Sequence, residues 1–181
     1  MVVFINGSFG VGKTTVARLL RGRVAGSAVY DPERAGVAMM RLSNLLNLKR
    51  AAAEDFQDFR LWRKSAVAGV RLFRALSRGT VFVPMTFSRR EYFDEVVAGV
   101  GRFDPEVRVF CLKAGLPTVR KRLAGREAEA EGPGAEWLAR RIAECDEAHR
   151  DPHFGEPVET EDRAAREVCE DIFNRLQAAS F

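Results

Sequence analysis

A nine-residue stretch near the amino terminus constrains this chain more than any other feature. Residues 7 to 15 read Gly-Ser-Phe-Gly-Val-Gly-Lys-Thr-Thr and contain the pattern G-x-x-x-x-G-K-[ST] without a gap. The apolar run Val2 to Ile5 precedes this pattern, and an amphipathic stretch follows from Val16. A strand, a glycine-rich loop and a helix in this order are typical of a loop that wraps phosphate groups. The sequence therefore predicts a nucleoside triphosphate site here.

The residue types of this loop match the requirements of a bound triphosphate. Glycines allow backbone N–H groups to approach the phosphates closely, and the helix that opens at Lys13 directs its unpaired amides and positive dipole end at the anion. We expect Lys13 to reach the β- and γ-phosphates, the Thr14 hydroxyl to bind Mg²⁺, and Thr15 to contact the α-phosphate. The predicted ATP-binding residues of the loop are Gly7, Gly10, Val11, Gly12, Lys13, Thr14 and Thr15.

Length and composition bound the domain organisation. The 181 residues, 46 % of them hydrophobic, suffice for one core but not for two comfortable domains. No apolar run approaches the roughly 20 residues that cross a bilayer, and Met1 leads directly into the first predicted strand. The cysteines, Cys111, Cys145 and Cys169, lie far apart without a C-x-x-C pair. We therefore expect a cytoplasmic protein with reduced thiols and a single domain over residues 1 to 181.

Charge is distributed unevenly along the chain. Residues 1 to 90 carry 16 basic and 5 acidic side chains, whereas residues 91 to 181 carry 13 and 20. Three explanations are open: an anionic ligand held by the first half, a nucleic-acid surface, or solvated helix faces. The basic residues form no recognised nucleic-acid-reading module, so we expect a small-molecule partner rather than a nucleic acid.

Strand and helix patterns alternate through the chain. Alternation of this kind predicts an α/β fold of the P-loop NTPase type, with a five-stranded parallel sheet and helices on both faces. The third strand is expected to end at Val83, since Pro84 cannot donate to a ladder. The five predicted strands are Val2 to Ile5, Ala28 to Tyr30, Thr80 to Val83, Val107 to Leu112 and Pro157 to Glu159.

Two helices between the second and third strands, at about residues 33 to 78, exceed the needs of a minimal strand–helix–strand unit. The first, Ala35 to Leu48, is apolar nearly all round, which fits either packing in the core or an apolar wall. Together the two helices predict a substrate-binding flap over the phosphate loop. In the second helix, the residues expected to face inward are Leu61, Ala68, Leu72 and Leu76.

The helix after the fourth predicted strand carries Arg122 and Arg126 one turn apart on its outer side. Acidic residues and the breaker Gly132-Pro133-Gly134 come next, which predicts a mobile lid over about residues 126 to 136. We expect Arg126 to hold the transferring phosphate and Arg122 to stack on the base. The alternative is a pair of arginines on a solvated helix face. Weaker candidates for the same task are Arg140 and Arg141.

Asp31 follows the second predicted strand, and ligands of α/β sheets bind at the carboxyl ends of parallel strands. A small-molecule kinase needs a carboxylate that orients the acceptor hydroxyl and accepts its proton. Asp31 is our candidate for this task, and a helix cap before Pro32 is the alternative. The stretch Val81 to Thr86 holds no carboxylate, so Mg²⁺ is left to Thr14, phosphate oxygens, water and Asp31. The predicted catalytic residues are Lys13, Asp31 and Arg126.

Several stretches of the chain resemble the tunicamycin resistance protein family, and they occur in that family's order. The resemblance runs from about residue 2 to about residue 175, and its middle motifs are far more specific than the phosphate loop. The stretches are Ile5-Asn6-Gly7 through Thr14, Tyr30-Asp31-Pro32-Glu33, Asp55-Phe56-Gln57 with Leu61-Trp62-Arg63, Val83-Pro84-Met85-Thr86, Glu91-Tyr92-Phe93, and Arg122-Leu123 with Arg126.

The resemblance implies an ATP-binding protein of the nucleoside monophosphate kinase-like P-loop class that protects a cell against tunicamycin, a lipid-bearing nucleoside antibiotic. It favours an ATP- and Mg²⁺-dependent phosphotransferase that acts on a hydroxyl of the drug or of a similar compound, with Arg60, Arg63 and Thr86 on the acceptor side. The apolar helix Ala35 to Leu48 would suit the acyl chain. Two alternatives stay open: a protein that sequesters the drug without transfer, and a kinase of a nucleotide or sugar metabolite.

Overall fold

The computed structural model describes residues 1–33, 60–127 and 135–178. Five strands form one sheet in the order β2-β3-β1-β4-β5, and every neighbouring pair is parallel. The predicted α/β fold with a five-stranded parallel sheet is therefore confirmed. The strands are β1 (Val2–Gly7), β2 (Ala28–Val29), β3 (Val81–Pro84), β4 (Val107–Lys113) and β5 (Glu156–Glu159).

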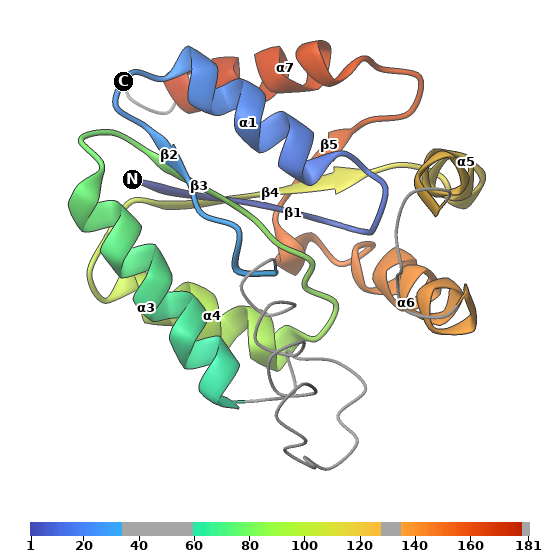
Figure 1. The fold of residues 1–181 in the computed structure, drawn as a ribbon, viewed down its shortest axis with the longest axis horizontal. Helices are drawn as coiled ribbons and strands as arrows, with labels where there is room; N and C mark the ends of the chain where they lie inside the picture. Colours follow the sequence, from blue (N-terminus) through green and yellow to red (C-terminus); the bar gives the residue numbers. More distant parts are fainter. Residues whose placement is uncertain (34–59, 128–134, 179–181) are drawn as a thin grey trace.

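Helices cover both faces of the sheet (Figure 1). Helices α1 and α7 lie on one face and α3 and α4 on the other, while α5 and α6 stand beyond the carboxyl end of β4. None of the described helices is both long and apolar enough to cross a membrane. The helices are α1 (Lys13–Arg23), α3 (Arg60–Leu76), α4 (Arg90–Gly101), α5 (Leu116–Glu127), α6 (Ala135–Ala148) and α7 (Ala165–Ala178), with a 3-10 turn, η2, at Pro152–Phe154.

The central strand β1 is buried along its whole length. Its continuous apolar run follows from this position, since a strand covered on both faces has no side that meets water. Val3 and Ile5 pack in the core under α1 and α7, whereas Val2 and Phe4 pack in the core under α3 and α4. The chain leaves β1 between these two cores, so the loop after Gly7 starts from a rigid base.

Strand β3 continues one residue further than predicted, through Pro84. The N–H groups of Val81 and Met85 donate on the β1 side, to Met1 O and Ile5 O, whereas Phe82 O accepts from the N–H of Tyr30 on the β2 side. Because successive residues of a strand face opposite neighbours, the missing N–H of Pro84 faces the β2 side, where pairing ends after Tyr30. The proline therefore stops the ladder with β2 and leaves the ladder with β1 intact.

Helix α3 buries a different face from the predicted one. Leu61, Leu72 and Leu76 are 61 %, 57 % and 76 % exposed, and Ala68 is exposed as well. Both faces have helical spacing, so periodicity did not distinguish them; the buried one carries Trp62, whose large side chain gains most from burial. The prediction for this helix was wrong because it followed the leucines. The apolar residues buried on α3 are Trp62, Ala66 and Val70.

Other sequence predictions fall partly outside the described residues. The apolar helix Ala35 to Leu48 lies there, as does Gly132-Pro133-Gly134 of the predicted lid. The cysteines are all described, and each is buried with a free thiol, as expected. Burial raises the pKa of Cys111 to about 12 and that of Cys145 to about 11, so neither is a reactive thiolate at neutral pH.

Candidate functional site

The phosphate loop joins the end of β1 to the start of α1 at the carboxyl edge of the sheet. Its three glycines have positive φ angles of 146° at Gly7, 76° at Gly10 and 101° at Gly12, a conformation that favours glycine. A Cβ on Gly7 would also lie 2.7 Å from the carbonyl oxygen of Leu112. The loop conformation thus depends on its glycines, as a cradle made of backbone N–H groups requires.

Lys13 begins α1 and turns back into the loop. Its side chain is buried, its Nζ donates to Ser8 O at 2.9 Å, and it lies 5.6 Å from the centre of the Phe9 ring. On the same first turn, Thr14 is half-buried and Thr15 is exposed. A cation, two hydroxyls and the amino end of a helix therefore share one concave loop, which is the arrangement that binds phosphate.

Two acidic residues follow β2 at this same edge. Tyr30 still donates its N–H to Phe82 O, and Asp31 and Glu33 come directly after. The carboxylate of Glu33 accepts a hydrogen bond from the backbone N–H of Thr86, beyond the end of β3. Burial raises the pKa of Glu33, and the Asp31 carboxylate raises it further, while Lys13 and the bond from Thr86 act in the opposite direction. Asp31 and Lys13 therefore both lie close enough to Glu33 to act on its charge.

The segment after β3, Met85 to Ser88, is fixed by side chains from two other elements. Asn6, in β1, accepts from the N–H of Phe87 at 2.8 Å and donates to Phe154 O at 3.1 Å. His149, directly after the end of α6, bonds Phe87 O through Nε2 at 2.7 Å. Since a carbonyl only accepts, Nε2 carries the proton. Burial lowers the pKa of His149 to about 4, so this ring is neutral at neutral pH.

A cavity of about 260 Å³ adjoins the outer side of the phosphate loop. It reaches from Thr15 to the connection between β5 and α7, where Thr160 and Arg163 line it. Arg122, from α5, also lines this cavity and donates to Thr160 at 3.1 Å (Oγ1) and 2.7 Å (backbone O). The predicted base-stacking arginine therefore lies beside the phosphate loop, with its guanidinium held at the wall of a cavity.

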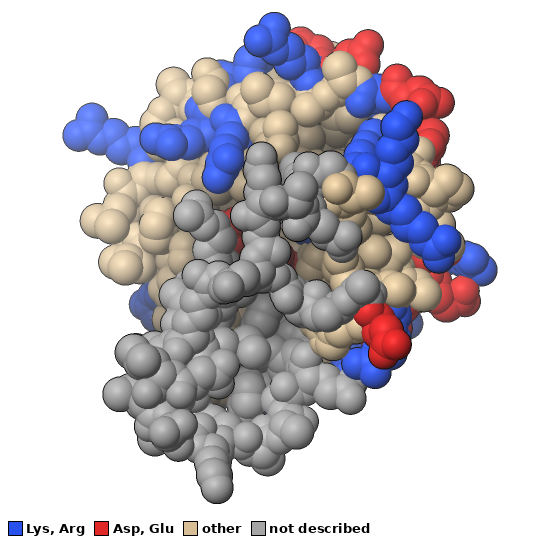
Figure 2. All heavy atoms as spheres, turned by 45° about the vertical axis from the view of Figure 1, so that its right-hand side comes forward, with Lys and Arg blue, Asp and Glu red and all other residues tan. Residues whose placement is uncertain are grey.

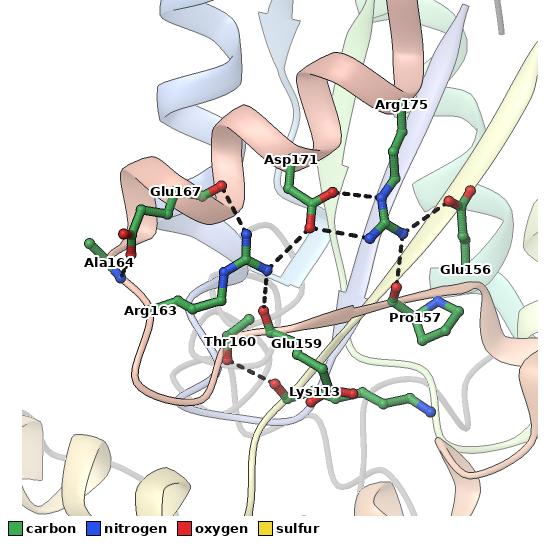
Figure 3. Close-up of polar contacts among 10 residues, drawn as sticks. All are labelled: Lys113, Glu156, Pro157, Glu159, Thr160, Arg163, Ala164, Glu167, Asp171 and Arg175. Atoms are coloured by element: carbon green, nitrogen blue, oxygen red, sulfur yellow. Dashed lines mark hydrogen bonds and ion pairs between the residues drawn. The ribbon is translucent and has the colours of Figure 1, made fainter. Parts of the chain in front are cut away.

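That wall is fixed by a network of charged side chains (Figure 3). Arg163 donates to Asp171 at 3.1 Å and to the carbonyl oxygens of Glu159 and Glu167 at 2.8 and 3.2 Å. Arg175 donates to the same Asp171 carboxylate at 2.7 Å. Although burial alone would raise the pKa of Asp171, the bonds from Arg175 and Arg163 hold it below its ordinary value. One carboxylate thus orders both arginines that tie α7 to the end of β5.

Most of the chain matches a known protein family. Residues 2–147 match the family model described as an AAA domain. The chain belongs to the AAA domain family. A comparison of its sequence with curated proteins gave no match.

Solved structures similar to this AAA domain include the tunicamycin resistance protein of Deinococcus radiodurans, with a TM-score of 0.72, 23 % identity, and 97 % of this chain and 95 % of that chain covered. A sugar kinase from a Janibacter species has a TM-score of 0.66, 16 % identity, and coverage of 97 % and 94 %. The shikimate kinase of Acinetobacter baumannii has a TM-score of 0.59, 13 % identity, and coverage of 98 % and 93 %. These likenesses show a P-loop kinase-like fold, as the sequence resemblance implied.

The remaining predicted site residues of this AAA domain are Arg126, Arg60 and Arg63. Arg126 lies in the last turn of α5, and its side chain is outside the described part. Arg60 is exposed, and Arg63 is buried, with Nε 2.6 Å from Glu95 and its guanidinium 4.2 Å from the centre of the Tyr92 ring. Both line a groove between α3 and α4. This groove shares no lining residue with the cavity beside the phosphate loop.

Sequence reasoning missed the contributions of Glu33, Asn6 and His149 to this edge. The pair Asp31-x-Glu33 was a usable signal for the first, because two carboxylates follow one strand. Asn6, at the end of an otherwise apolar strand, was a signal for the second. His149 continues an apolar stripe of α6, which indicated burial but not the bond to Phe87.

Basic side chains flank the edge that carries the site. Figure 2 brings this edge of the sheet forward and shows Lys and Arg side chains on two separated sides of the face, with acidic side chains concentrated toward the upper right. A rim of cations raises the local concentration of anions such as phosphates.

Proposed function

We propose that the protein is an ATP-dependent kinase that transfers the γ-phosphoryl group to a hydroxyl of tunicamycin or of a similar nucleoside-type antibiotic. The observation that carries the proposal is the cluster of Lys13, Asp31 and Glu33 at the mouth of the phosphate loop. Phosphoryl transfer needs a cation on the phosphates and a carboxylate at the acceptor hydroxyl, and this cluster supplies both.

The residues of the loop fit a bound MgATP, which supplies the phosphoryl group. The positive-φ glycines free backbone N–H groups for the phosphates, and Lys13 stands among them. Mg²⁺ prefers oxygen ligands, and the Thr14 hydroxyl and the Asp31 carboxylate are the oxygen donors that we propose for it. Since β3 has no carboxylate, these two residues take over a task that an acidic strand end performs in many such folds.

The cavity beside the loop is the proposed base site. Arg122 lines it together with Thr160 and Arg163, and a guanidinium plane stacks well on an aromatic ring. We propose that Arg122 covers the base and that Arg126, one turn further along α5, holds the transferring phosphate.

On the acceptor side, we propose that Asp31 orients the hydroxyl and that Glu33 shares the task of removing its proton. A base is most efficient when its pKa lies near the working pH, and burial shifts Glu33 in that direction. The acceptor oxygen then bonds to the γ-phosphorus, the bond to the β-phosphate oxygen breaks, the proton passes to the carboxylate and ADP leaves. Thr86, which bonds Glu33, is our candidate for the acceptor side, whereas Arg60 and Arg63 line the separate groove between α3 and α4.

The substrate class rests on similarity rather than on the site. The structure of a tunicamycin resistance protein resembles this chain over nearly its whole length, as do those of a sugar kinase and a shikimate kinase. Tunicamycin, sugars and shikimate all carry hydroxyl groups on a ring. We therefore place a nucleoside antibiotic first and a sugar or nucleotide metabolite second.

Mass spectrometry of the products tests the proposal. Purified protein, Mg-ATP and tunicamycin should give drug heavier by one phosphoryl group, and Lys13→Ala should give none. Tight drug binding without product, together with full protection of cells by Lys13→Ala, would instead favour sequestration. Faster turnover of an unmodified metabolite than of the drug would favour the metabolic kinase.

A further inference from the structure

A second, larger cavity lies in the groove between α3 and α4. Its volume is about 740 Å³, within the range of about 300–1,000 Å³ that is usual for small-molecule sites. It shares no lining residue with the cavity beside the phosphate loop. The charged residues that line it are Arg60, Arg63, Lys64, Arg71 and Arg102, with Glu95 as the single carboxylate.

The positive charge of this groove is largely unmatched. Glu95 lies 2.6 Å from Arg63, so these two opposite charges form an ion pair. The other four cations are exposed and form no ion pair with any residue in the described part of the chain. Arg74, on the same helix but outside the groove, is by contrast paired with Asp104 at 2.5 Å. A concave wall with one sign of charge focuses its potential and attracts counter-ions more than a flat surface does.

The cations are also arranged in a row. Arg60, Lys64 and Arg71 lie on one side of α3, one and two turns apart, so the row is about 16 Å long. Arg102 lines the groove directly after the end of α4, and Phe103 adds an apolar surface, with its ring centre 5.9 Å from the Arg71 guanidinium. Arginine binds phosphate oxygens in pairs of parallel hydrogen bonds. An elongated ligand with phosphate groups and an apolar part matches these features better than a single small anion.

We propose that the groove between α3 and α4 binds a small molecule that carries two or more phosphate charges, at a site separate from the phosphate loop. The groove ligand is held by Lys64, Arg71 and Arg102 and rests on Phe103. The inference does not depend on the proposed function, because it uses none of the residues that would bind ATP.

Calorimetric titration with inorganic tripolyphosphate tests this site. The phosphate loop is first saturated with a non-hydrolysable ATP analogue and Mg²⁺, so that further binding reports on other sites. The groove variant is Arg71→Ala with Arg102→Ala. The control variant, Arg120→Ala with Arg166→Ala, removes the same charge from exposed positions on α5 and α7.

We expect about one further equivalent of tripolyphosphate to bind the wild type, at least tenfold weaker binding to the groove variant, and less than a twofold change in the control. Equal weakening of tripolyphosphate binding in both variants would show that net charge alone causes the effect, and it would overturn the proposed site. The absence of tripolyphosphate binding after saturation of the phosphate loop would overturn it as well. Failure of the phosphate loop to bind the analogue would overturn the proposed function, while the comparison of the two variants would still decide on the groove.

Discussion

The carboxylate of Glu33 accepts a hydrogen bond from the backbone N–H of Thr86, 53 residues further along the chain. Glu33 follows β2 and Thr86 follows β3, and the next N–H, that of Phe87, donates to Asn6 at the end of β1. Three neighbouring strand ends are therefore bonded to one another at the mouth of the phosphate loop. A site built on such an edge keeps its geometry without depending on a flexible loop.

The first prediction concerns Lys13. In Lys13→Ala, we expect phosphoryl transfer to fall by about 10²–10³-fold, because a preorganised cation near the developing charge is lost. The fold should survive, since the hydrogen bond from Lys13 to Ser8 O is worth only about 1 kcal/mol. Single-turnover kinetics and a thermal melt measure the two effects. Lys121→Ala, an exposed lysine on α5, serves as the control; equal rates in both variants would contradict the assignment.

The second prediction separates Asp31 from the nucleotide. In Asp31→Asn, transfer should fall by about 10²–10⁴-fold, the range for loss of a general base, while ATP affinity stays nearly intact. Titration calorimetry with an ATP analogue in the absence of Mg²⁺ removes the metal from the comparison. A parallel loss of affinity and rate in the absence of Mg²⁺ would assign Asp31 to structure rather than to the acceptor.

The third prediction uses the direction in which folding shifts the pKa of Glu33. Burial raises the pKa of Glu33, so between its ordinary value of 4.5 and its folded value the native state binds more protons than the unfolded state. Ionisation of Glu33 therefore lowers stability as the pH rises through this window. Glu33→Gln keeps an oxygen for the Thr86 N–H and removes the charge.

At neutral pH, Glu33→Gln should therefore unfold at a higher temperature than the wild type and yet transfer phosphoryl groups more slowly. The gain in stability should vanish below the ordinary pKa of a glutamate, where both proteins are uncharged at this position. Thermal melts at several pH values measure it, with the exposed Glu91→Gln on α4 as the matched control. A variant that is less stable at neutral pH would show that the charge itself supports the fold.

Local patterns predicted most of the framework. The glycines of the phosphate loop, the apolar run of β1 and the position of Pro84 each depend on backbone rules that act within a few residues, and the structure agrees with them to within one residue. Arg122 was found by spacing along one helix. These features required no knowledge of which segments meet in space.

Long-range contacts were not predictable in the same way. The buried face of α3 was predicted wrongly because two faces, one with Leu72 and one with Trp62, both carry apolar residues at helical spacing. Only packing against the sheet determines which of the two faces is buried. The bond from Thr86 to Glu33 joins two strand ends that are neighbours solely because β2 pairs with β3. His149 bonds Phe87 because α6 brings it close to the end of β3. No sequence pattern predicts the position of α6 relative to β3.

The fourth prediction tests the base site. In Arg122→Ala, the KM for ATP should rise about tenfold with a smaller change in the KM for the acceptor, because a stacked guanidinium contributes about 1–2 kcal/mol. Arg122→Lys keeps the charge but not the planar surface, so it should restore little of the affinity. Full rescue by lysine would indicate a phosphate contact instead. Arg120→Ala, exposed on the same helix, controls for charge.

The fifth prediction concerns Asp171, which orders Arg163 and Arg175 (Figure 3). Asp171→Asn removes the charge that both guanidinium groups share, and it should lower the free energy of unfolding by about 1.5–3 kcal/mol. It should also weaken ATP binding, because Arg163 lines the base cavity. Glu170→Gln, whose partner Arg23 is exposed, should cost less than about 1 kcal/mol. Urea unfolding of the two variants compares them directly.

The sixth prediction uses the buried ring of His149. Its pKa falls from 6.5 to about 4 on folding, so between these values the unfolded state binds more protons and stability is lost as the pH decreases. The loss attributable to this group should reach about 3 kcal/mol between neutral pH and pH 4. His149→Gln should be less stable at neutral pH, where the bond to Phe87 is weakened, but it should lose less on acidification, so the two curves converge. Urea unfolding of the wild type and of this variant at neutral pH and at pH 4 measures the two losses; equal losses in both proteins would contradict this assignment.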